Sequence, residues 1–365
     1  MRVAIDATPL TVPTGGIRRY VVELTRALAL QFPEDDYLLL SDQGGWRLPD
    51  EIAPLANVSA PLPPALGWRR KWWSLGLPWA LIRENVDVFH GSDFSIPYLP
   101  LKPTVLMIHD LSPWKPGELA PGGSERIRSR TRHLAHLATM VVTPSEAIRR
   151  ETSAYFGRPS SAIAVTPLAA CEGMAAVSES VVAPQLEKLG IGGPYALYLG
   201  SLMKRKNVPR LIEAWRLART QIPGLSLVVA GAAGDLDISL KTEPGLHILG
   251  PLSDNAAAGL LSGAAVFVYP SFYEGFGLPV LEAMRAGTPV ITSKDPALME
   301  VAGGAAFPVD AKSLSEISSA IVAIVNRPGL RERLQAKGRH RASCYSWQST
   351  AVRTHAAYAE AIRRF

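Results

Sequence analysis

Cysteine is scarce in this chain of 365 residues, which has only Cys171 and Cys344, far apart in the sequence. Two distant cysteines argue against a disulfide framework and are typical of a reducing compartment. Long hydrophobic runs are missing too: no stretch of about 18 apolar residues occurs, which excludes a membrane-spanning helix. Met1–Asp6 predicts the start of a strand rather than a signal peptide, because no apolar segment follows it.

A large excess of one charge is also missing. The chain has 38 Lys and Arg against 32 Asp and Glu, a net charge of +6, and the first 180 residues hold equal numbers of both signs. A surplus this small argues against a nucleic-acid partner, but its place in the second half suits a pocket for an anionic ligand. With 47% hydrophobic and 19% charged residues, disorder and coiled coil are excluded as the main state.

Patterns for a metal site or a serine nucleophile are absent from the sequence. The seven His and two Cys residues show no zinc-ligand spacing, and no cluster of carboxylates suits magnesium. A G-x-S-x-G nucleophile elbow does not occur either. We therefore expect a reaction that uses no metal and no cofactor.

Short apolar runs alternate with helical patterns along the whole chain, which predicts an α/β fold with parallel sheets. The length suits two domains, and two doubly wound Rossmann-like units of similar size are the simplest interpretation. The predicted strands are Arg2–Asp6, Tyr37–Ser41, Val86–His90, Thr104–His109, Met140–Pro144, Tyr195–Gly200, Leu225–Gly231, His247–Leu249, Val266–Pro270 and Pro289–Thr292. The predicted helices are Ile17–Gln31, Ser124–Ala138, Pro209–Thr220, Pro279–Ala286 and Leu314–Val325.

The domain boundaries follow from the segment Glu172–Pro194, which lacks a strand pattern and ends in Gly192-Gly193-Pro194. It is interpreted as a linker between a first domain at 1–175 and a second at 190–345. Ligands of open parallel sheets bind at the carboxyl ends of the strands, so functional residues are expected directly after each strand.

The most informative stretch runs from Tyr269 to Ala283, from a strand through a glycine-containing loop into a helix. Gly275 and Gly277 allow close approach of a ligand, and the loop and helix start favour a phosphate. Glu282, one turn inside the helix, can accept hydrogen bonds from a vicinal diol, and Glu274 can bind a sugar hydroxyl. The alternative is an exposed loop with an acidic first turn.

A second stretch, Gly200–Asn207, also lies between a strand and a helix and holds three successive cations that suit a diphosphate. The alternative is a solvated basic turn. Thr14-Gly15-Gly16 precedes the first long helix, where an anion can bind, although the pattern is far from a complete dinucleotide motif. His109 ends an apolar strand and either faces a binding cleft or serves the structure.

Together these stretches resemble the retaining nucleotide-sugar glycosyltransferases of family 4, which have the GT-B architecture of two facing Rossmann-like domains. The most specific element is Glu274 to Glu282, followed by Ala286-Gly287-Thr288-Pro289-Val290. Further motifs support the resemblance over nearly the whole chain: Thr14-Gly15-Gly16, His109-Asp110, Thr143-Pro144-Ser145-Glu146, Arg205-Lys206-Asn207 and Tyr345-Ser346-Trp347. The resemblance also implies that residues 346–365 form a helix that packs back on the N-terminal domain.

The resemblance implies specific roles. Glu282 would hold the ribose hydroxyls of the donor, and Arg205 and Lys206 would bind its diphosphate. Where many members have an Arg after the glycine of the basic loop, this chain has Ser201 after Gly200, so Arg205 must supply that charge or the diphosphate is held less tightly. Contacts to the transferred sugar and the phosphates would come from Gly16, beside Gly15, and from His109, Glu274, Gly275, Phe276, Gly277 and Leu278.

The implied reaction transfers a hexose, with mannose from GDP-mannose favoured, to a glycan or lipid-linked acceptor in bacterial surface polysaccharide synthesis. The leaving diphosphate would be stabilised by cations and amides, without a metal. Two alternatives stay open: a nucleotide-sugar epimerase of the same architecture, and a non-catalytic nucleotide-sugar-binding subunit.

Leu66–Trp73 places three basic residues among three tryptophans, a combination found where proteins contact anionic membranes. Arg126, Arg128, Arg130 and Arg132 alternate along a predicted helix and so cannot form one narrow stripe. Both stretches also fit solvated surface, with the tryptophans in the core. We expect a cytoplasmic protein with peripheral contact at the inner face of the membrane.

Overall fold

The chain forms two compact units in a computed structural model that describes residues 1–12, 15–62, 70–120, 124–236 and 243–365. Unit 1 consists of Met1–Leu111, Gly123–Leu168 and Ser346–Phe365, and unit 2 of Ser112–Gly122 and Ala169–Tyr345. The short segment Ser112–Gly122 thus belongs to unit 2, although the sequence-based boundary placed it in the first domain.

Unit 1 is built on a parallel sheet in the order β3-β2-β1-β4-β5-β6-β7. Its central strands are buried along nearly their whole length, as expected for a parallel sheet covered on both faces. The strands are β1 (Arg2–Asp6), β2 (Asp36–Leu40), β3 (Val58–Ser59), β4 (Val88–Gly91), β5 (Thr104–Met107), β6 (Met140–Thr143) and β7 (Ile163–Val165).

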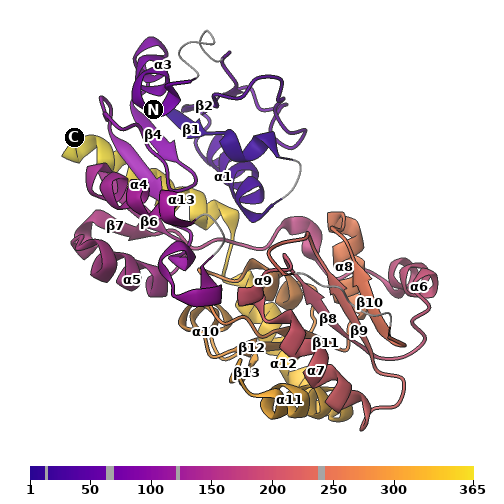
Figure 1. Cartoon of the computed structure of the whole chain (residues 1–365). Helices are drawn as coiled ribbons and strands as arrows, with labels where there is room; N and C mark the ends of the chain where they lie inside the picture. Colours follow the sequence, from indigo (N-terminus) through magenta and orange to yellow (C-terminus); the bar gives the residue numbers. More distant parts are fainter. Residues whose placement is uncertain (13–14, 63–69, 121–123, 237–242) are drawn as a thin grey trace. The chain divides into compact units, whose positions relative to one another are not determined.

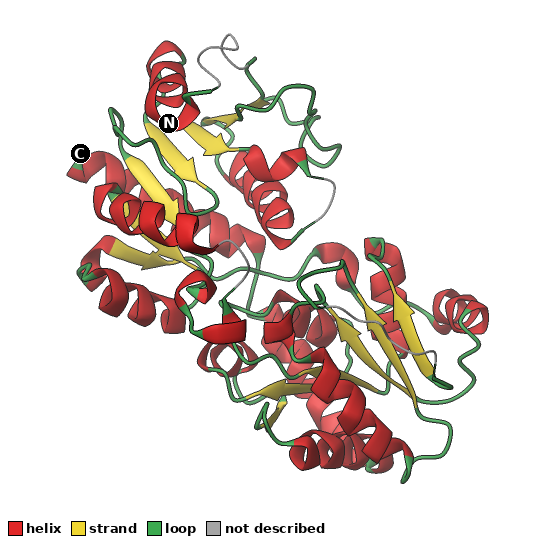
Figure 2. Cartoon of the chain, in the orientation of Figure 1, coloured by secondary structure: helices red, strands yellow, loops and turns green. Residues whose placement is uncertain are grey.

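Helices lie on both sides of this sheet (Figure 2). In α1 the buried positions Tyr20, Leu24 and Leu28 recur every four residues and face the core. A short π-helical segment, η2 (Trp72–Gly76), runs directly into α3. The helices of unit 1 are α1 (Gly16–Gln31), α3 (Leu77–Arg83), α4 (Ser124–Leu137), α5 (Glu146–Phe156) and α13 (Trp347–Arg364).

Unit 2 repeats the same strand order, β10-β9-β8-β11-β12-β13, again with parallel pairs throughout. Both sheets have the order of a doubly wound dinucleotide-binding fold, so the predicted fold class is confirmed. The strands are β8 (Tyr195–Leu199), β9 (Ser226–Ala230), β10 (Leu246–Leu249), β11 (Val266–Tyr269), β12 (Val290–Ser293) and β13 (Phe307–Val309).

The predicted linker at Glu172–Pro194 is wrong, because this segment contains the helix α6 (Glu179–Lys188), which packs against α8 within unit 2. Pro184 inside the helix and the glycines behind it concealed the helical pattern. The other helices of unit 2 are α7 (Val208–Arg219), α8 (Asp254–Gly263), α9 (Leu278–Arg285), α10 (Pro296–Ala302), α11 (Leu314–Asn326) and α12 (Pro328–Ser343).

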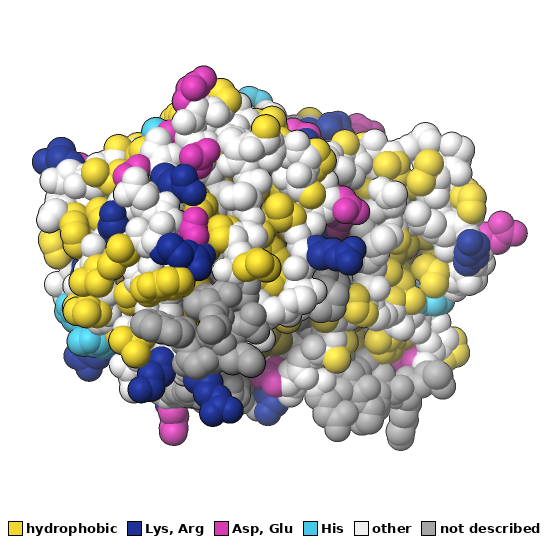
Figure 3. All heavy atoms as spheres, turned by 90° about the horizontal axis from the view of Figure 1, so that it is seen from above, with side chains coloured by type: hydrophobic (Ala, Val, Ile, Leu, Met, Phe, Trp, Pro, Cys, Tyr) yellow, Lys and Arg dark blue, Asp and Glu magenta, His cyan; other side chains and the backbone are white. Residues whose placement is uncertain are grey.

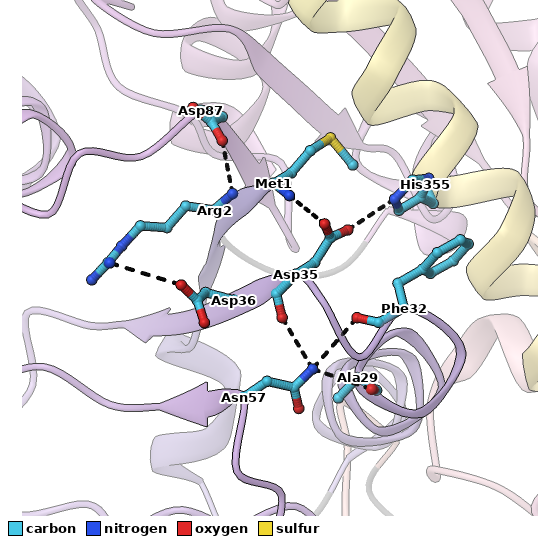
Figure 4. Close-up of polar contacts among 9 residues, drawn as sticks. All are labelled: Met1, Arg2, Ala29, Phe32, Asp35, Asp36, Asn57, Asp87 and His355. Atoms are coloured by element: carbon cyan, nitrogen blue, oxygen red, sulfur yellow. Dashed lines mark hydrogen bonds and ion pairs between the residues drawn. The ribbon is translucent and has the colours of Figure 1, made fainter.

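The last helix, α13, returns to unit 1, where it packs against α1 and the strands β4 to β7 (Figure 1). Its His355 ring stacks on Phe32 with centroids 3.7 Å apart, and His355 Nε2 lies 2.9 Å from Asp35 Oδ2. Figure 4 shows that Asp35 also pairs with the Met1 amino group. Deeper in the core, the Tyr358 hydroxyl lies 3.1 Å from Nδ1 of His90 on β4. These contacts fix the end of the chain on unit 1.

Candidate functional site

The candidate site of unit 2 lies where the strand order of its sheet reverses. β8 and β11 are neighbours at the centre, and the chain continues from them toward opposite edges. Their carboxyl ends carry two loops, which we call the cationic loop (Gly200–Asn207) and the glycine loop (Pro270–Gly277). Such a reversal leaves a crevice between the loops and is the common ligand-binding place of open α/β sheets.

The two loops are joined by a buried cluster of charges. Lys206 Nζ donates to Glu274 Oε1 at 2.5 Å and to the Tyr269 hydroxyl at 2.8 Å. Arg205 Nη1 donates to the other Glu274 oxygen at 3.3 Å and to the Tyr273 carbonyl at 2.9 Å. The structure therefore brings together three of the predicted site residues.

Burial and the neighbouring cations act in opposite directions on Glu274. Burial alone would raise the pKa of this carboxyl, but the charges of Lys206 and Arg205 and the hydrogen bond from Lys206 outweigh it and lower the pKa to about 2. Glu274 is therefore ionised at neutral pH. Among these three side chains, two positive charges face one negative charge at the ends of β8 and β11.

Asn207 holds the two loops in place. Its backbone has φ 62° and ψ 31°, a left-handed conformation that asparagine tolerates better than most residues. Its side-chain amide donates to the Pro270 carbonyl at 3.1 Å and to the Ala311 carbonyl at 2.7 Å. The Phe272 N–H adds a hydrogen bond of 2.9 Å to the Arg205 carbonyl. Arg205 and Lys206 are thus presented by a rigid turn.

The glycine loop packs against the start of α10, through Gly277 beside Leu298 and through Asp295 beside the Glu274 backbone. Gly277 has φ 102°, and a Cβ at this position would lie 2.4 Å from Leu298 Cδ2, so only glycine fits. Asp295 accepts from the N–H groups of Ala297 and Leu298 and from the Glu274 backbone. Burial raises the pKa of Asp295 to about 6. Asp295 was not predicted, because a single aspartate two residues after a strand, here β12, is too common a signal to select it.

The remaining predicted residues of unit 2 lie along the same two loops and the following helix. Glu282 is buried in α9, one turn after its first residue Leu278. Phe276 packs edge-on against Tyr345, with ring centroids 5.8 Å apart. The Ser201 carbonyl accepts a hydrogen bond of 3.0 Å from the Tyr198 hydroxyl. Gly200 directly follows β8, and Gly275 precedes Phe276 in the glycine loop.

A residue from the first half of the chain also reaches this site. Lys115, in the segment that belongs to unit 2, places Nζ 4.3 Å from the centroid of the Tyr273 ring. The Tyr273 carbonyl is the one that accepts from Arg205. Sequence reasoning did not find Lys115, because its contact with the glycine loop is tertiary and no local pattern marks it.

The predicted residues of unit 1 follow β1 and β5, the strands on either side of β4, beside the reversal of strand order between β1 and β4. Gly15 and Gly16 begin α1 and line a pocket of about 460 Å³. His109 follows β5, with Nε2 2.8 Å from the Ser92 carbonyl and its ring edge-on to Tyr20. Burial lowers the pKa of His109, although the bond to Ser92 opposes this. Thr14 lies outside the described residues.

Neither a metal-binding cluster nor a membrane-spanning helix occurs among the residues that the structure describes. No group of three or more His, Cys, Asp or Glu side chains is placed to hold a metal ion. In the same part of the chain, every helix is too short or too polar to cross a bilayer. Of the tryptophans expected at a membrane surface in Leu66–Trp73, Trp72 is instead buried in the core and Trp73 lines the pocket of unit 1. Leu66–Arg69, which includes Trp68, lies outside the described residues.

Two family models match this chain. The model of the glycosyl transferases group 1 matches residues 184–341, and the model of Glycosyltransferase Family 4 matches residues 14–169. The first match contains the cationic loop, the glycine loop and α9. The second match covers unit 1 from Gly15 and Gly16, at the start of α1, to β7.

The chain is similar to O-antigen chain mannosyltransferase B of Escherichia coli, with 30% identity over 98% of this chain and 99% of the relative. It is 41% identical to MMP alpha-(1->4)-mannosyltransferase of Mycolicibacterium hassiacum, over 33% of this chain and 30% of the relative. Among solved structures, HepE of Anabaena in complex with UDP and glucose superposes with a TM-score of 0.75 at 17% identity, over 97% of this chain and 98% of that one. This structural likeness supports a GT-B fold.

Proposed function

This chain belongs to the group 1 glycosyl transferases, and on that premise we propose that it transfers mannose from GDP-mannose to a glycan or lipid-linked acceptor. The similarity to two mannosyltransferases, one of which acts on the O-antigen chain, supports the choice of mannose and of a surface polysaccharide. We propose that the anomeric configuration of the sugar is retained.

The observation that carries this proposal is the buried cluster of Lys206, Arg205 and Glu274. Its two cations and one carboxylate lie at the carboxyl ends of β8 and β11, where an open sheet binds its ligand. The diphosphate of the donor gains negative charge as the bond to the sugar breaks. Cations that are already fixed in position stabilise this charge without rearranging, which is an effective form of catalysis.

The other roles follow from this placement of the diphosphate. Glu282 would hold the ribose hydroxyls, and the N–H groups of Gly275 to Leu278 would bind phosphate oxygens and sugar. The leaving phosphate would accept the proton of the attacking hydroxyl, so a protein base is not needed. In this reading Glu274 positions Lys206 and Arg205 and is not a nucleophile. The roles of Gly16 and His109 in unit 1 stay predictions.

The test is a donor screen that follows the product by mass, with GDP-mannose and UDP-glucose, each with and without a lipid-linked oligosaccharide. NMR of the product gives its anomeric configuration. Lys206→Ala is expected to lower kcat at least 100-fold. Lys337→Ala is the matched control, because Lys337 is an exposed lysine on α12, outside both loops. Equal kinetics of both variants would contradict the assignment of this site.

The same screen separates the alternatives. Conversion of the donor sugar without an acceptor would identify an epimerase. Binding of GDP-mannose without any turnover would identify a non-catalytic subunit. Transfer from UDP-glucose in place of GDP-mannose would retain the reaction type and correct the donor.

We also propose peripheral contact with an anionic membrane, at the inner face, through a patch formed by Leu75, Trp79 and Ile82. These side chains are 39% to 55% exposed and lie on one face of η2 and α3. Arg70, Lys71 and Arg83 lie in or beside these elements and are exposed. The view in Figure 3 shows hydrophobic side chains next to Lys and Arg side chains on the surface. An apolar face with basic neighbours suits an anionic bilayer.

Vesicle sedimentation tests this contact. Trp79→Ser with Ile82→Ser is expected to lower binding to phosphatidylglycerol vesicles at least fivefold. Val352→Ser serves as the control, because Val352 is an exposed apolar residue on α13. Unchanged partition of the double variant would contradict membrane contact at this patch.

A further inference from the structure

The glycine loop presents backbone N–H groups that no backbone hydrogen bond orients. In the part of the chain that the structure describes, the N–H groups of Phe276 and Gly277 make no hydrogen bond. Open N–H groups that lead into a helix suit a phosphate or a sugar oxygen. Their direction must therefore be fixed by the packing of side chains around the loop.

The Phe276 side chain packs against a residue far along the chain. Phe276 is only 5% exposed although it lies in a loop, and its ring meets the Tyr345 ring with centroids 5.8 Å apart and an angle of 80° between the planes. This edge-to-face arrangement is favourable, because the positive edge of one ring faces the negative face of the other. The position of Phe276 thus depends on where Tyr345 is held.

Tyr345 is itself held by Arg341, which lies four residues earlier in the last turn of α12. Arg341 Nη2 donates to the Tyr345 hydroxyl at 2.7 Å, and the guanidinium carbon lies 4.9 Å from the centroid of the Tyr345 ring. Burial raises the pKa of Tyr345, although Arg341 opposes this, so the hydroxyl is protonated at neutral pH. One guanidinium therefore binds both the hydroxyl and the ring of Tyr345.

The same guanidinium binds the end of α10. Arg341 Nε donates to the Val301 carbonyl at 2.9 Å, and Nη2 donates to the Glu300 carbonyl at 2.7 Å. A cation at the end of a helix satisfies open carbonyls and interacts favourably with the helix dipole. A Cβ on Gly303 would lie 2.5 Å from Arg341 Nε, so the arginine lies close against the turn that ends α10.

The two ends of α10 are thus both connected to the glycine loop. At its first turn, Asp295 accepts from the Glu274 backbone. At its last turn, Arg341 and Tyr345 connect the helix to Phe276. All of these residues belong to unit 2, and Tyr345 is the last of them before the chain returns to unit 1. The loop is held directly before its open N–H groups and again at Phe276.

We infer that Tyr345 is a positioning residue for donor binding, which holds the glycine loop through Phe276 in the form that binds the nucleotide sugar. The inference rests on the proposed function, because it concerns the donor site of that reaction. In this role Tyr345 acts through another side chain, so it is not a catalytic residue. Loss of its ring weakens donor binding while the rest of unit 2 stays folded.

Calorimetry with GDP-mannose on full-chain variants tests the inference. Tyr345→Leu removes the ring and should raise the dissociation constant about tenfold. Tyr345→Phe keeps the ring against Phe276 and should restore the constant to within threefold of wild type. Tyr155→Leu is the matched control, because Tyr155 is 45% exposed on α5 in unit 1, and it should bind the donor like wild-type protein.

A double-variant cycle tests the route through Phe276. Phe276→Leu combined with Tyr345→Leu should bind GDP-mannose about as weakly as the weaker single variant, because both substitutions remove the same contact. Losses that multiply would overturn this route. Arg341→Lys is the further variant if Tyr345→Leu fails to fold. It keeps the charge but cannot bind all three partners at once, so the dissociation constant should rise about threefold.

Amide hydrogen exchange without a ligand keeps the inference separate from the proposed function. Peptides that cover Phe272–Leu278 should exchange at least fivefold faster in Tyr345→Leu than in wild-type protein, and at the wild-type rate in Tyr155→Leu. Unchanged exchange in Tyr345→Leu, or unchanged affinity for GDP-mannose, would overturn the role of Tyr345. Wild-type protein that does not bind GDP-mannose would instead contradict the proposed function, and the exchange rates would still decide whether Tyr345 holds the loop.

Discussion

Lys206 Nζ lies 2.5 Å from Glu274 Oε1, and each of these two residues is only 6% exposed. An ammonium and a carboxylate are thus enclosed together at the point where the cationic loop meets the glycine loop. Removing either one leaves the other charge buried with weaker compensation. The residue pair that we assign to donor binding therefore also holds the site together.

Glu274→Gln should lower the free energy of unfolding by about 3–5 kcal/mol, because the Lys206 charge stays buried without its carboxylate. The double variant Lys206→Met with Glu274→Gln should recover at least half of this loss, since neither charge remains. Urea unfolding measures both. Equal stability of Glu274→Gln and wild-type protein would show that the pair is solvated in solution.

The low pKa of Glu274 predicts a loss of stability in acid. Its pKa is about 2 in the folded protein and about 4.5 in an unfolded chain, so its stabilising contribution is fully present above pH 4.5. This contribution disappears as the pH falls from 4.5 to 2. The free energy of unfolding of wild-type protein should therefore decrease more steeply over this range than that of the double variant above.

Asp6 predicts the opposite dependence in unit 1. Burial raises its pKa from 3.8 to about 6, so the folded state favours the protonated form. Its contribution to stability is present below pH 3.8 and is lost as the pH rises to 6. Asp6→Asn should flatten the pH dependence of the free energy of unfolding between pH 4 and 6. An unchanged slope in this variant would mean that Asp6 titrates normally.

Replacing Asn207 should separate its backbone role from its side-chain role. Asn207→Gly keeps the left-handed conformation but loses two buried hydrogen bonds, so we expect a loss of about 1–3 kcal/mol. Asn207→Ala should cost about 1 kcal/mol more, because alanine disfavours positive φ. Thermal unfolding ranks the two variants. If Asn207→Ala were as stable as Asn207→Gly, the turn would have relaxed to another conformation.

Gly277→Ala should destabilise unit 2 and weaken donor binding. The new Cβ would collide with Leu298 at 2.4 Å in addition to adopting φ 102°. Gly190→Ala is the matched control, since Gly190 also has positive φ but open space around it, and should cost about 1 kcal/mol. Calorimetry with GDP-mannose should show an effect in Gly277→Ala alone. Similar behaviour of both variants would make the contact with Leu298 unimportant.

Most of the fold could be predicted from the sequence, because buried parallel strands appear as short apolar runs between helical patterns. The strands that were missed, β3, β7 and β13, have only two or three residues and lie at or next to the edges of their sheets. Such short pieces form because a neighbouring strand offers hydrogen bonds, which no local pattern reveals. Helix α6 was missed for a different reason, because Pro184 and the glycines at 192–193 suggested a break.

The candidate site was predictable where its residues follow a strand within a recognisable motif, as Arg205, Lys206 and Glu274 do. The rule that ligands bind at strand ends also applies to Asp6, Asp93 and Asp295, but a single aspartate after a strand is too common to select. Lys115 could not be selected at all. Its role depends on a tertiary contact with Tyr273.

The position of α13 has a consequence for the order of events during biosynthesis. Its Tyr358 and His355 complete contacts with His90 and Asp35, which leave the ribosome more than two hundred residues earlier. Until α13 emerges, the surfaces of α1 and β4 to β7 that it covers stay open to water. Unit 2 is synthesised in full during this interval, so the part of the protein made first is the last to reach its final packing.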